Sequence, residues 1–402
     1  MSNMVPMIRF RGFTDDWEER KLTDILSRLS KSSNNSELPK IEFEDIVAGE
    51  GRLNKDVSHK FDDRKGILFE SQNILYGKLR PYLKNWLLAD FKGIALGDFW
   101  VFKSINSDPK FVYSLIQSNH YQKVANDTSG TKMPRSDWKK VSSTDFPTPS
   151  SLEEQQKIGS FFKQLDNTIA LHQRILDLLK KQKKGFLQKM FPKNGAKVPE
   201  LRFEGFTDDW EDRKLGDISD VTKLAGFEFT KYVRYQESGK IIALRGLNVK
   251  NGNLVLDDVK YIDDSDFAKL NRSKLYKNDI LLTYVGTVGE LAIVPEDNKY
   301  FLAPNVARIR LQGHVSPMFV CQMMNDSNFY NRIILPLIAT SSQPALSMEN
   351  VRKFQLLMPD YQEQQKMGAF FKQLDNTIAL HQRKLNLLKE QKKGFLQKMF
   401  VS

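Results

Sequence analysis

A stretch of helix-forming sequence occurs twice in this chain, with the apolar spacing of a coiled coil. The run FFKQLDNTIALHQR begins at Phe161 and returns unchanged at Phe370, and no proline interrupts residues 152–190. Steps of four and three residues keep one stripe mostly apolar over more than four heptads, as in paired helices. That stripe holds Ile158, Phe162, Leu165, Ile169, Leu176 and Leu179, and then Met367, Phe371, Leu374, Ile378, Leu385 and Leu388. The pattern predicts two helices, each roughly 55–60 Å long at about 1.5 Å per residue.

Four polar residues, His172, Lys183, His381 and Lys392, interrupt this seam. Single polar seam positions fix the register of paired helices. We interpret both histidines in this way rather than as metal ligands or pH sensors. The seam could pair with another chain. Since the chain must leave the first helix, build a second insert and return, we expect antiparallel pairing within the chain, about an approximate two-fold axis.

Duplicated segments, which we call the frame, surround two inserts whose sequences look unrelated. The block GFTDDW begins at Gly12 and again at Gly205. The copies of this block are 193 residues apart, whereas those of the helices are 209 apart, so the second insert is 16 residues longer. Both inserts, residues 38–150 and 218–360, contain β-branched and aromatic runs cut by glycine and proline, and short amphipathic helical stretches at 109–124 and 317–334.

These features predict an α+β protein, in which two mixed α/β domains are joined by two long antiparallel coiled-coil helices with internal pseudo-two-fold symmetry. The expected segments are a first globular domain over residues 1–150 and a central helix over 151–191. A linker with the second globular domain over 192–360 and a C-terminal helix over 361–402 follow.

Positive charge is concentrated on the predicted helices rather than on the inserts. The formal net charge is +12. Residues 152–191 hold eight Lys/Arg against four Asp/Glu, and residues 361–400 hold eight against three, so +3 remains for the rest. A basic helix face is often simply solvated. The single Cys321 and the absence of any long apolar run predict a cytoplasmic protein with no membrane segment.

Each insert nevertheless carries residue types that suit nucleic acid. Arginine and lysine bond phosphates or guanine edges, glutamine bonds adenine, and threonine contacts the thymine methyl. In the first insert, cations and aromatics alternate from Lys78 to Trp86, which on a strand would share one face. The candidate DNA contacts there are Lys78, Arg80, Tyr82, Lys84, Lys132, Arg135, Lys139 and Lys140. In the second insert they are Arg245, Lys250, Thr283, Tyr284, Thr287, Arg308, Arg310 and Gln343, with Ser341 and Ser342 beside the last.

No catalytic motif accompanies them. The sequence contains no GxxxxGK[ST] phosphate loop, no GxGxxG before a helix and no HExxH. Five histidines and one cysteine without ligand spacing predict no metal site. The adjacent carboxylates of DDWEER and DDWEDR lie in the duplicated frame, where a docking or capping role is the simpler interpretation. We therefore expect no catalytic residue.

The repeated blocks resemble the specificity subunits of type I restriction–modification systems. The resemblance rests on PxxxxEQQKIGSFF at Pro149 and PxxxEQQKMGAFF at Pro359, and on WEERKLTDI and WEDRKLGDI before each insert. LYGKLRPYL in the first insert and NDILLTYVGTVGE in the second add to it. The resemblance covers essentially the whole chain.

This resemblance implies two target-recognition domains that each read one half of a split DNA target. The helices would then act as a ruler and bind two adenine-methyltransferase subunits, and restriction/translocase subunits would complete the assembly on double-stranded DNA. It also implies that the chain is not catalytic and binds no cofactor itself, with S-adenosylmethionine, ATP and Mg²⁺ belonging to its partners. Two alternatives remain from the residues alone: a scaffold that presents two protein-binding modules, and a recognition half fused to its own catalysis.

Overall fold

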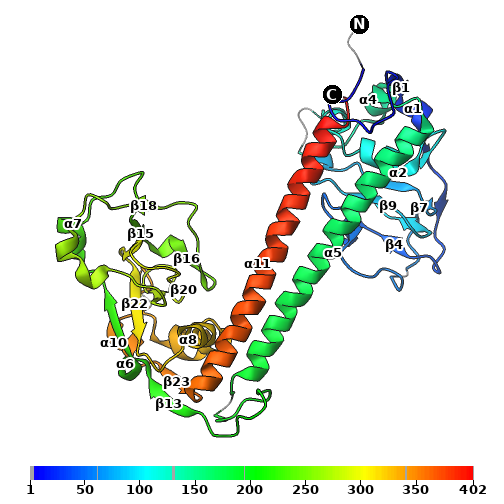
Figure 1. Cartoon of the computed structure of the whole chain (residues 1–402). Helices are drawn as coiled ribbons and strands as arrows, with labels where there is room; N and C mark the ends of the chain where they lie inside the picture. The colour runs from blue at the N-terminus through cyan, green and yellow to red at the C-terminus, as the bar shows by residue number, and fades with distance from the viewer. Residues whose placement is uncertain (1–3, 61, 129–131, 194, 340–341, 402) are drawn as a thin grey trace. The chain divides into compact units, whose positions relative to one another are not determined.

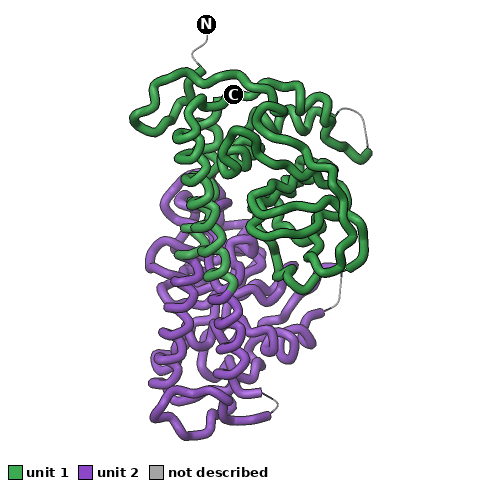
Figure 2. Tube along the Cα trace, turned by 90° about the vertical axis from the view of Figure 1, so that its right-hand side faces the viewer, with its two compact units in different colours: residues 1–177, 380–402 green, residues 178–379 purple. Residues whose placement is uncertain are grey.

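The computed structural model describes residues 4–60, 62–128, 132–193, 195–339 and 342–401. The chain divides into two compact units, which Figure 2 colours separately. Unit 1 comprises residues 1–177 and 380–402, and unit 2 comprises residues 178–379. Each unit therefore contains one insert and one part of both long helices.

The two predicted long helices are present and antiparallel. They are α5 (Leu152–Met190) and α11 (Tyr361–Lys398), drawn green and red in Figure 1. In unit 1, Phe161 near the start of α5 meets Phe395 near the end of α11, with ring centroids 5.0 Å apart. In unit 2, Phe186 near the end of α5 meets Phe370 near the start of α11 at 5.1 Å. Early residues of one helix thus contact late residues of the other in both units.

The residues predicted for the helix seam are shielded from solvent to different degrees. Eight of them are buried: Ile158, Phe162, Ile169, Leu176, Met367, Phe371, Leu385 and Leu388. The other four, Leu165, Leu179, Leu374 and Ile378, are half-buried. Four of the buried residues, Ile158, Phe162, Met367 and Phe371, also belong to the hydrophobic cores of the globular modules.

The globular part of unit 1 is built on two four-stranded sheets. Antiparallel pairs place the strands of the first in the order β2 (Leu26–Leu29), β11 (Phe99–Ser104), β8 (Ile74–Gly77) and β9 (Trp86–Leu88). The second has the order β3 (Ser32–Ser33), β7 (Gly66–Phe69), β10 (Gly93–Ala95) and β4 (Lys40–Ile41), with β10 and β4 parallel. A small pair joins β5 (Ile46–Val47) to β6 (Arg52–Leu53). The helices are α1 (Leu22–Ile25), α2 (Pro109–Leu115), α3 (Asn119–Ala125) and α4 (Trp138–Ser143).

Unit 2 repeats the first of these sheets, although its insert looks unrelated in sequence. The strand order is β14 (Ser219–Lys223), β22 (Val306–Leu311), β19 (Ile280–Thr283) and β20 (Leu291–Ile293), again antiparallel. A second sheet orders β18 (Lys260–Tyr261), β15 (Ile242–Leu244) and β21 (Tyr300–Leu302), and a small pair joins β16 (Val249–Lys250) to β17 (Asn253–Leu254). The helices are α6 (Leu215–Ile218), α7 (Gly226–Tyr232), α8 (Pro317–Met324), α9 (Ser327–Phe329) and α10 (Met348–Arg352).

The two helical stretches expected in the inserts are each broken. Residues 109–124 form α2 and α3, with Ser118 capping the second helix through a hydrogen bond from the Tyr121 amide. Residues 317–334 form α8 and then α9, which continues as a π-helical segment over Tyr330–Ile334; the carboxylate of Asp326, before α9, accepts from the Asn328 amide. A side chain that accepts an amide hydrogen starts a new helix, because it satisfies a donor that a continuous helix would use internally.

The duplicated frame attaches each module to the helices in the same way. Strand β1 (Glu18–Lys21) pairs antiparallel with β12 (Asp145–Thr148), and β13 (Glu211–Lys214) pairs with β23 (Gln355–Met358). The tryptophan of each GFTDDW block is buried. Trp17 lies edge-on to Phe111 and Phe400, and Trp210 lies edge-on to Phe319 and Phe191. The block is thus part of each core, where aromatic edge contacts add to area burial.

Two helix glycines permit this attachment. A Cβ atom on Gly159 would lie 2.5 Å from the backbone nitrogen of Phe111, so α2 could not approach α5 as it does. At Gly368 a Cβ would lie 2.9 Å from Cβ of Met318 in α8. Nothing lies within 4 Å of a Cβ built on Gly185 or Gly394. Only the first pair of glycines therefore has a packing role.

Candidate nucleic-acid interface

The predicted DNA contacts of unit 1 gather around the turn between β8 and β9. Lys78, Arg80, Tyr82 and Lys84 lie on this turn, which contains a short 3₁₀ segment at Pro81–Leu83. The later loop joins it: the Arg80 amide donates to the Pro134 carbonyl at 2.7 Å, and the Ser136 amide donates to the Lys78 carbonyl at 2.8 Å. Two clusters that begin 54 residues apart in the sequence, at Lys78 and at Lys132, therefore form one surface.

The expected alternation along one strand face is wrong. Strand β8 ends at Gly77, and the chain turns through left-handed conformations at Arg80 and Lys84. Tyr82 and Leu83 are exposed at 56% and 41%, whereas Trp86 is buried in β9. Side chains alternate between two faces only in an extended strand. The prediction therefore failed beyond Gly77, where β8 ends.

Part of this cationic surface is neutralised within the chain. Asp98 faces Arg135 at 3.0 Å and Lys78 at 3.6 Å, and the hydrogen bond from Arg135 holds the pKa of that carboxyl below its usual range. Lys140 pairs with Asp127 at 3.1 Å. Among the described residues, no ion-pair partner faces Arg80, Lys84, Lys132 or Lys139. These four cations remain available to an anionic ligand.

In unit 2, three predicted contacts line one open hollow of about 600 Å³. Arg245 and Lys250 reach it from the segment around β16, and Thr287 reaches it from the turn between β19 and β20. Tyr235, Leu247 and Asn305 line it too, and sequence analysis missed all three. Leu247 is 52% exposed, and no polar or charged pattern marks such a residue in a sequence. Arg245 also binds Asp258 at 2.8 Å, which fixes its guanidinium at the rim.

Thr283 and Arg308 are buried and stabilise the fold, so their prediction as DNA contacts is corrected. Thr283 is 1% exposed, and its hydroxyl donates to the Thr287 carbonyl at 2.5 Å and accepts from the Glu290 amide at 2.9 Å. Arg308 is 4% exposed and is bonded to Asp220. Burial lowers the pKa of Arg308, as expected for a cation removed from water.

The remaining predicted residues of unit 2 have mixed environments. Arg310 makes two hydrogen bonds to Asp279, at 2.7 and 2.8 Å, and this partner raises the pKa of Arg310. Tyr284 is half-buried, with the Lys223 ammonium 5.0 Å from its ring centroid. Ser342 and Gln343 are exposed, and Ser341 lies outside the described residues. Arg310 and Tyr284 are thus held by internal contacts, and their contribution to a DNA surface stays a prediction.

Polar residues of the helix seam form cross-helix pairs. In unit 1, Lys392 binds Asp166 at 2.6 Å, and in unit 2 Lys183 binds Asp375 at 2.6 Å. Burial raises the pKa of Asp166 although Lys392 opposes the shift. His172 and His381 lie with their Nδ1 atoms 3.1 Å apart in unit 1. Each polar group meets a partner at only one alignment of the helices, which fixes the register.

A second duplicated ion pair ties the N-terminal segment of each copy to a long helix. Arg9 donates two hydrogen bonds to Glu154 at 2.6 and 2.8 Å, and Arg202 donates two to Glu363, both at 2.8 Å. Both carboxylates are 1% exposed. Planar two-point bonding of this kind is specific in geometry as well as strong.

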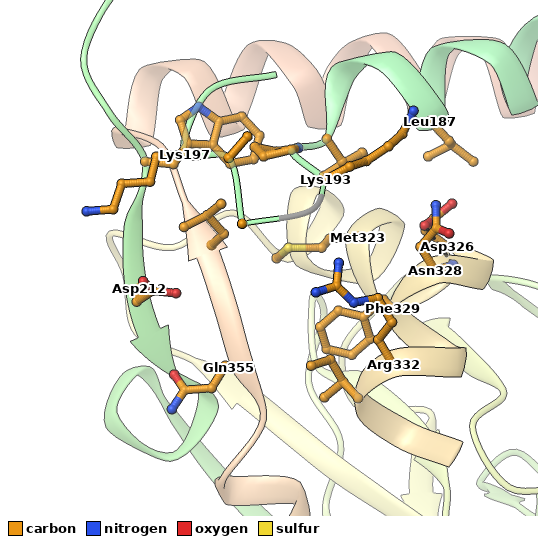
Figure 3. A pocket seen from close by; sticks show the side chains of 17 residues that line it. Leu187, Lys193, Lys197, Asp212, Met323, Asp326, Asn328, Phe329, Arg332 and Gln355 are labelled. Carbon is orange, nitrogen blue, oxygen red and sulfur yellow. Dashed lines mark hydrogen bonds between the residues drawn. The ribbon is translucent and has the colours of Figure 1, made fainter. Parts of the chain in front are cut away.

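A separate hollow of about 300 Å³ lies in unit 2 near the end of α5. Figure 3 shows the Arg332 side chain directed toward Met323 at its centre, whereas Lys197 points away. None of the predicted DNA contacts lines it. Among the described residues, no cluster of three or more His, Cys, Asp or Glu could hold a metal ion. In that same part of the chain, no helix is both long and apolar enough to cross a membrane.

Comparison with known proteins gives one consistent family. The family model for the type I restriction modification DNA specificity domain matches twice, over residues 14–181 and 207–390. The MjaVIII specificity subunit of Methanocaldococcus jannaschii is 24% identical over 342 residues, which are 82% of this chain and 76% of that protein. The EcoKI specificity subunit of Escherichia coli K12 is 24% identical over 248 residues, which are 57% of this chain and 50% of that one.

A solved structure supports the fold. The type I restriction–modification S subunit of M. genitalium aligns with a TM-score of 0.65 at 14% identity, and the alignment covers 99% of this chain and 100% of that one. At this identity the likeness concerns the fold alone.

Proposed function

Because this chain belongs to the family of type I restriction–modification specificity subunits, which are non-catalytic DNA recognition subunits, we propose that each unit reads one half of a bipartite DNA target. Unit 1 reads with the surface around the β8–β9 turn, and unit 2 reads with the hollow that Arg245, Lys250 and Thr287 line. The two surfaces differ in charge and shape, as two readers of different half-sites must.

The observation that carries this proposal is the contrast between frame and insert. The frame repeats its ion pairs and aromatic contacts in both units, whereas the side chains on the equivalent turns differ entirely. A fixed attachment with a variable surface allows a new half-site to be read without loss of the fold. A non-DNA scaffold would not require cations without internal partners on the turn of unit 1.

The long helices have a different role in this proposal. A stiff helix pair fixes the separation of two readers, as dimeric DNA-binding proteins fix half-site spacing. Their basic faces lie beside phosphates of the unread spacer, which position without specifying sequence. The helices also bind two methyltransferase subunits that modify adenine, and restriction/translocase subunits complete the assembly. S-adenosylmethionine, ATP and Mg²⁺ belong to those partners, and the complex acts on chromosomal DNA in the cytoplasm.

Methylome sequencing tests the proposal. A cell supplied with this chain and its methyltransferase partner should carry methylated adenines in a split motif with an unread spacer. Replacing residues 38–140 with the insert of a relative should change one half of the motif and leave the other half and the spacer unchanged. A change in both halves, or in neither, would contradict the division of reading between the units.

A further inference from the structure

The turn between β8 and β9 of unit 1 has a direct counterpart in unit 2. The strands on either side, β8 and β9 in one unit and β19 and β20 in the other, occupy the same places in sheets of the same order. In each insert, a loop that follows later in the sequence is hydrogen-bonded to the turn. The Arg80 amide donates to the Pro134 carbonyl, and the Gly286 amide donates to the Pro344 carbonyl at 3.0 Å. The two turns are therefore equivalent structures in modules whose sequences differ.

Both turns need left-handed backbone, but they obtain it differently. In unit 2, glycines supply it, with φ of 80° at Gly286 and 96° at Gly289. In unit 1, Arg80 has φ 49° and ψ 61°, and Lys84 has φ 58° and ψ 44°. This conformation is unfavourable for a residue with a Cβ atom, and only asparagine and aspartate adopt it routinely besides glycine. Unit 2 shows that glycine is compatible with this turn.

Arginine and lysine are unusual in this conformation. Eight non-glycine residues have positive φ in the described part of the chain, and five are asparagines: Asn106, Asn251, Asn278, Asn298 and Asn305. The other three are Gln72, Arg80 and Lys84. Hydrogen bonds hold the strained positions in place, from the Leu83 amide to the Arg80 carbonyl at 2.8 Å and from the Gly49 amide to the Lys84 carbonyl at 2.9 Å.

The strain is not offset by contacts of the two side chains within the protein. Arg80 and Lys84 are exposed, and in the described residues neither side chain has an ion-pair or hydrogen-bond partner. Tyr82 stands between them, 56% exposed. Strained residues that persist without an internal benefit point to a function outside the chain.

We propose that Arg80 and Lys84 bind backbone phosphates of the DNA beside the half-site read by unit 1, with Tyr82 packed against the sugar edge between them. This inference rests on the proposed function. Phosphates are favoured over base edges because roughly half or more of the hydrogen bonds between proteins and DNA go to phosphate and sugar oxygens, and arginine and lysine are among their main donors. Phosphate contacts position a protein without specifying sequence.

Asparagine provides the decisive substitution, because it keeps the left-handed backbone and removes the charge. We would assemble the chain with its methyltransferase subunits and measure binding to two duplexes of equal length by fluorescence anisotropy. One duplex carries the split motif and the other lacks it. The variants are R80N, K84N and the double variant. The matched control is Q72N, which relieves the third strained position at the other end of β8 without removing a charge.

R80N and K84N should each weaken binding of both duplexes by a similar factor, about eightfold at 0.1 M salt if one phosphate contact is lost. The slope of log affinity against log salt should fall by about 0.9 per substitution. Their thermal unfolding midpoints should equal or exceed that of the wild type, as should that of Q72N, which should bind normally. The methylated motif should not change.

Unchanged affinity in both variants would overturn the inference. Weakening confined to the duplex with the motif, or an altered motif, would also overturn it, because the turn would then read bases. Equal weakening by Q72N would show that backbone strain and not charge mattered, and would overturn it as well. Failure of the proposed function is distinguishable, since the wild-type complex would then produce no split motif.

Discussion

In unit 1, Arg9 donates two hydrogen bonds to Glu154, Trp17 packs on Phe111, and Lys392 pairs with Asp166. In unit 2, the equivalent residues repeat these contacts: Arg202 with Glu363, Trp210 with Phe319, and Lys183 with Asp375. The modules held by these contacts share a sheet order but present different surfaces. The comparison shows that the attachment of each module to the helices is the same in both copies, whereas the sequences of the turns differ.

The copies are not equivalent in every detail, and these differences make the comparison testable. Asp375 accepts a second hydrogen bond from Gln322, whereas the glutamine of unit 1, Gln117, bonds Lys392 instead. Asp166 is more deeply buried than Asp375, with 12% of its side chain exposed against 27%. The same ion pair thus sits in two different environments.

Removing the arginine of the fixed attachment should have the largest effect. R9A and R202A each leave a carboxylate that is 1% exposed without its partner, and an unpaired buried charge costs about 3–5 kcal/mol of unfolding free energy. Scanning calorimetry of the full chain should show similar losses for both variants. The control is R20A, whose partner Glu18 is 54% exposed, so its loss should stay below about 1 kcal/mol. A large loss for only one of R9A and R202A would break the equivalence of the two copies.

Removing the lysine of each cross-helix pair should lower the free energy of unfolding by different amounts in the two copies. We expect K392M to cost about 3 kcal/mol because Asp166 is left buried, and K183M to cost about 1 kcal/mol because Asp375 retains Gln322 and more solvent. Urea denaturation at neutral pH measures both. Equal losses would show that burial of the carboxylate does not decide the cost.

The loss in K392M should also depend on pH. The pKa of Asp166 is already raised in the folded state, and loss of Lys392 raises it further. A carboxyl with a raised folded-state pKa is stabilised by protonation at low pH, and this contribution is lost as pH rises through that pKa. The difference between variant and wild type should therefore shrink as pH falls toward the ordinary Asp value of about 4. A difference that grows on acidification would contradict this.

Alanine at the helix glycines should give smaller effects of opposite sign. G159A places a Cβ 2.5 Å from backbone and should destabilise by about 2 kcal/mol, in the range of overpacking. G185A and G394A meet nothing within 4 Å and should each stabilise by up to about 1 kcal/mol, the helix preference of alanine over glycine. Thermal unfolding of the three variants measures the sign. A stabilised G159A would show that the approach of α2 does not require glycine.

Much of the frame could be predicted from the sequence. Heptad spacing from Ile158 onward and its return at Met367 predicted two long helices, and both are present with antiparallel contacts. The interface was less predictable. Arg308 and Lys84 are both cations in strand-rich sequence, yet one is buried against Asp220 and the other is exposed. Side-chain type does not reveal burial where the local period is interrupted.

The sequence by itself determined the duplication, the helix pair and the division into frame and inserts, because letter identity and a sustained heptad period are local properties of a chain. Only the tertiary structure decided that the dissimilar inserts share one sheet order, that residues 78–84 and 132–136 form one surface, and that Arg80 and Lys84 adopt left-handed backbone. Strand pairing and loop contact join residues far apart in the sequence, and a turn conformation is imposed by the strands and loops that clamp it.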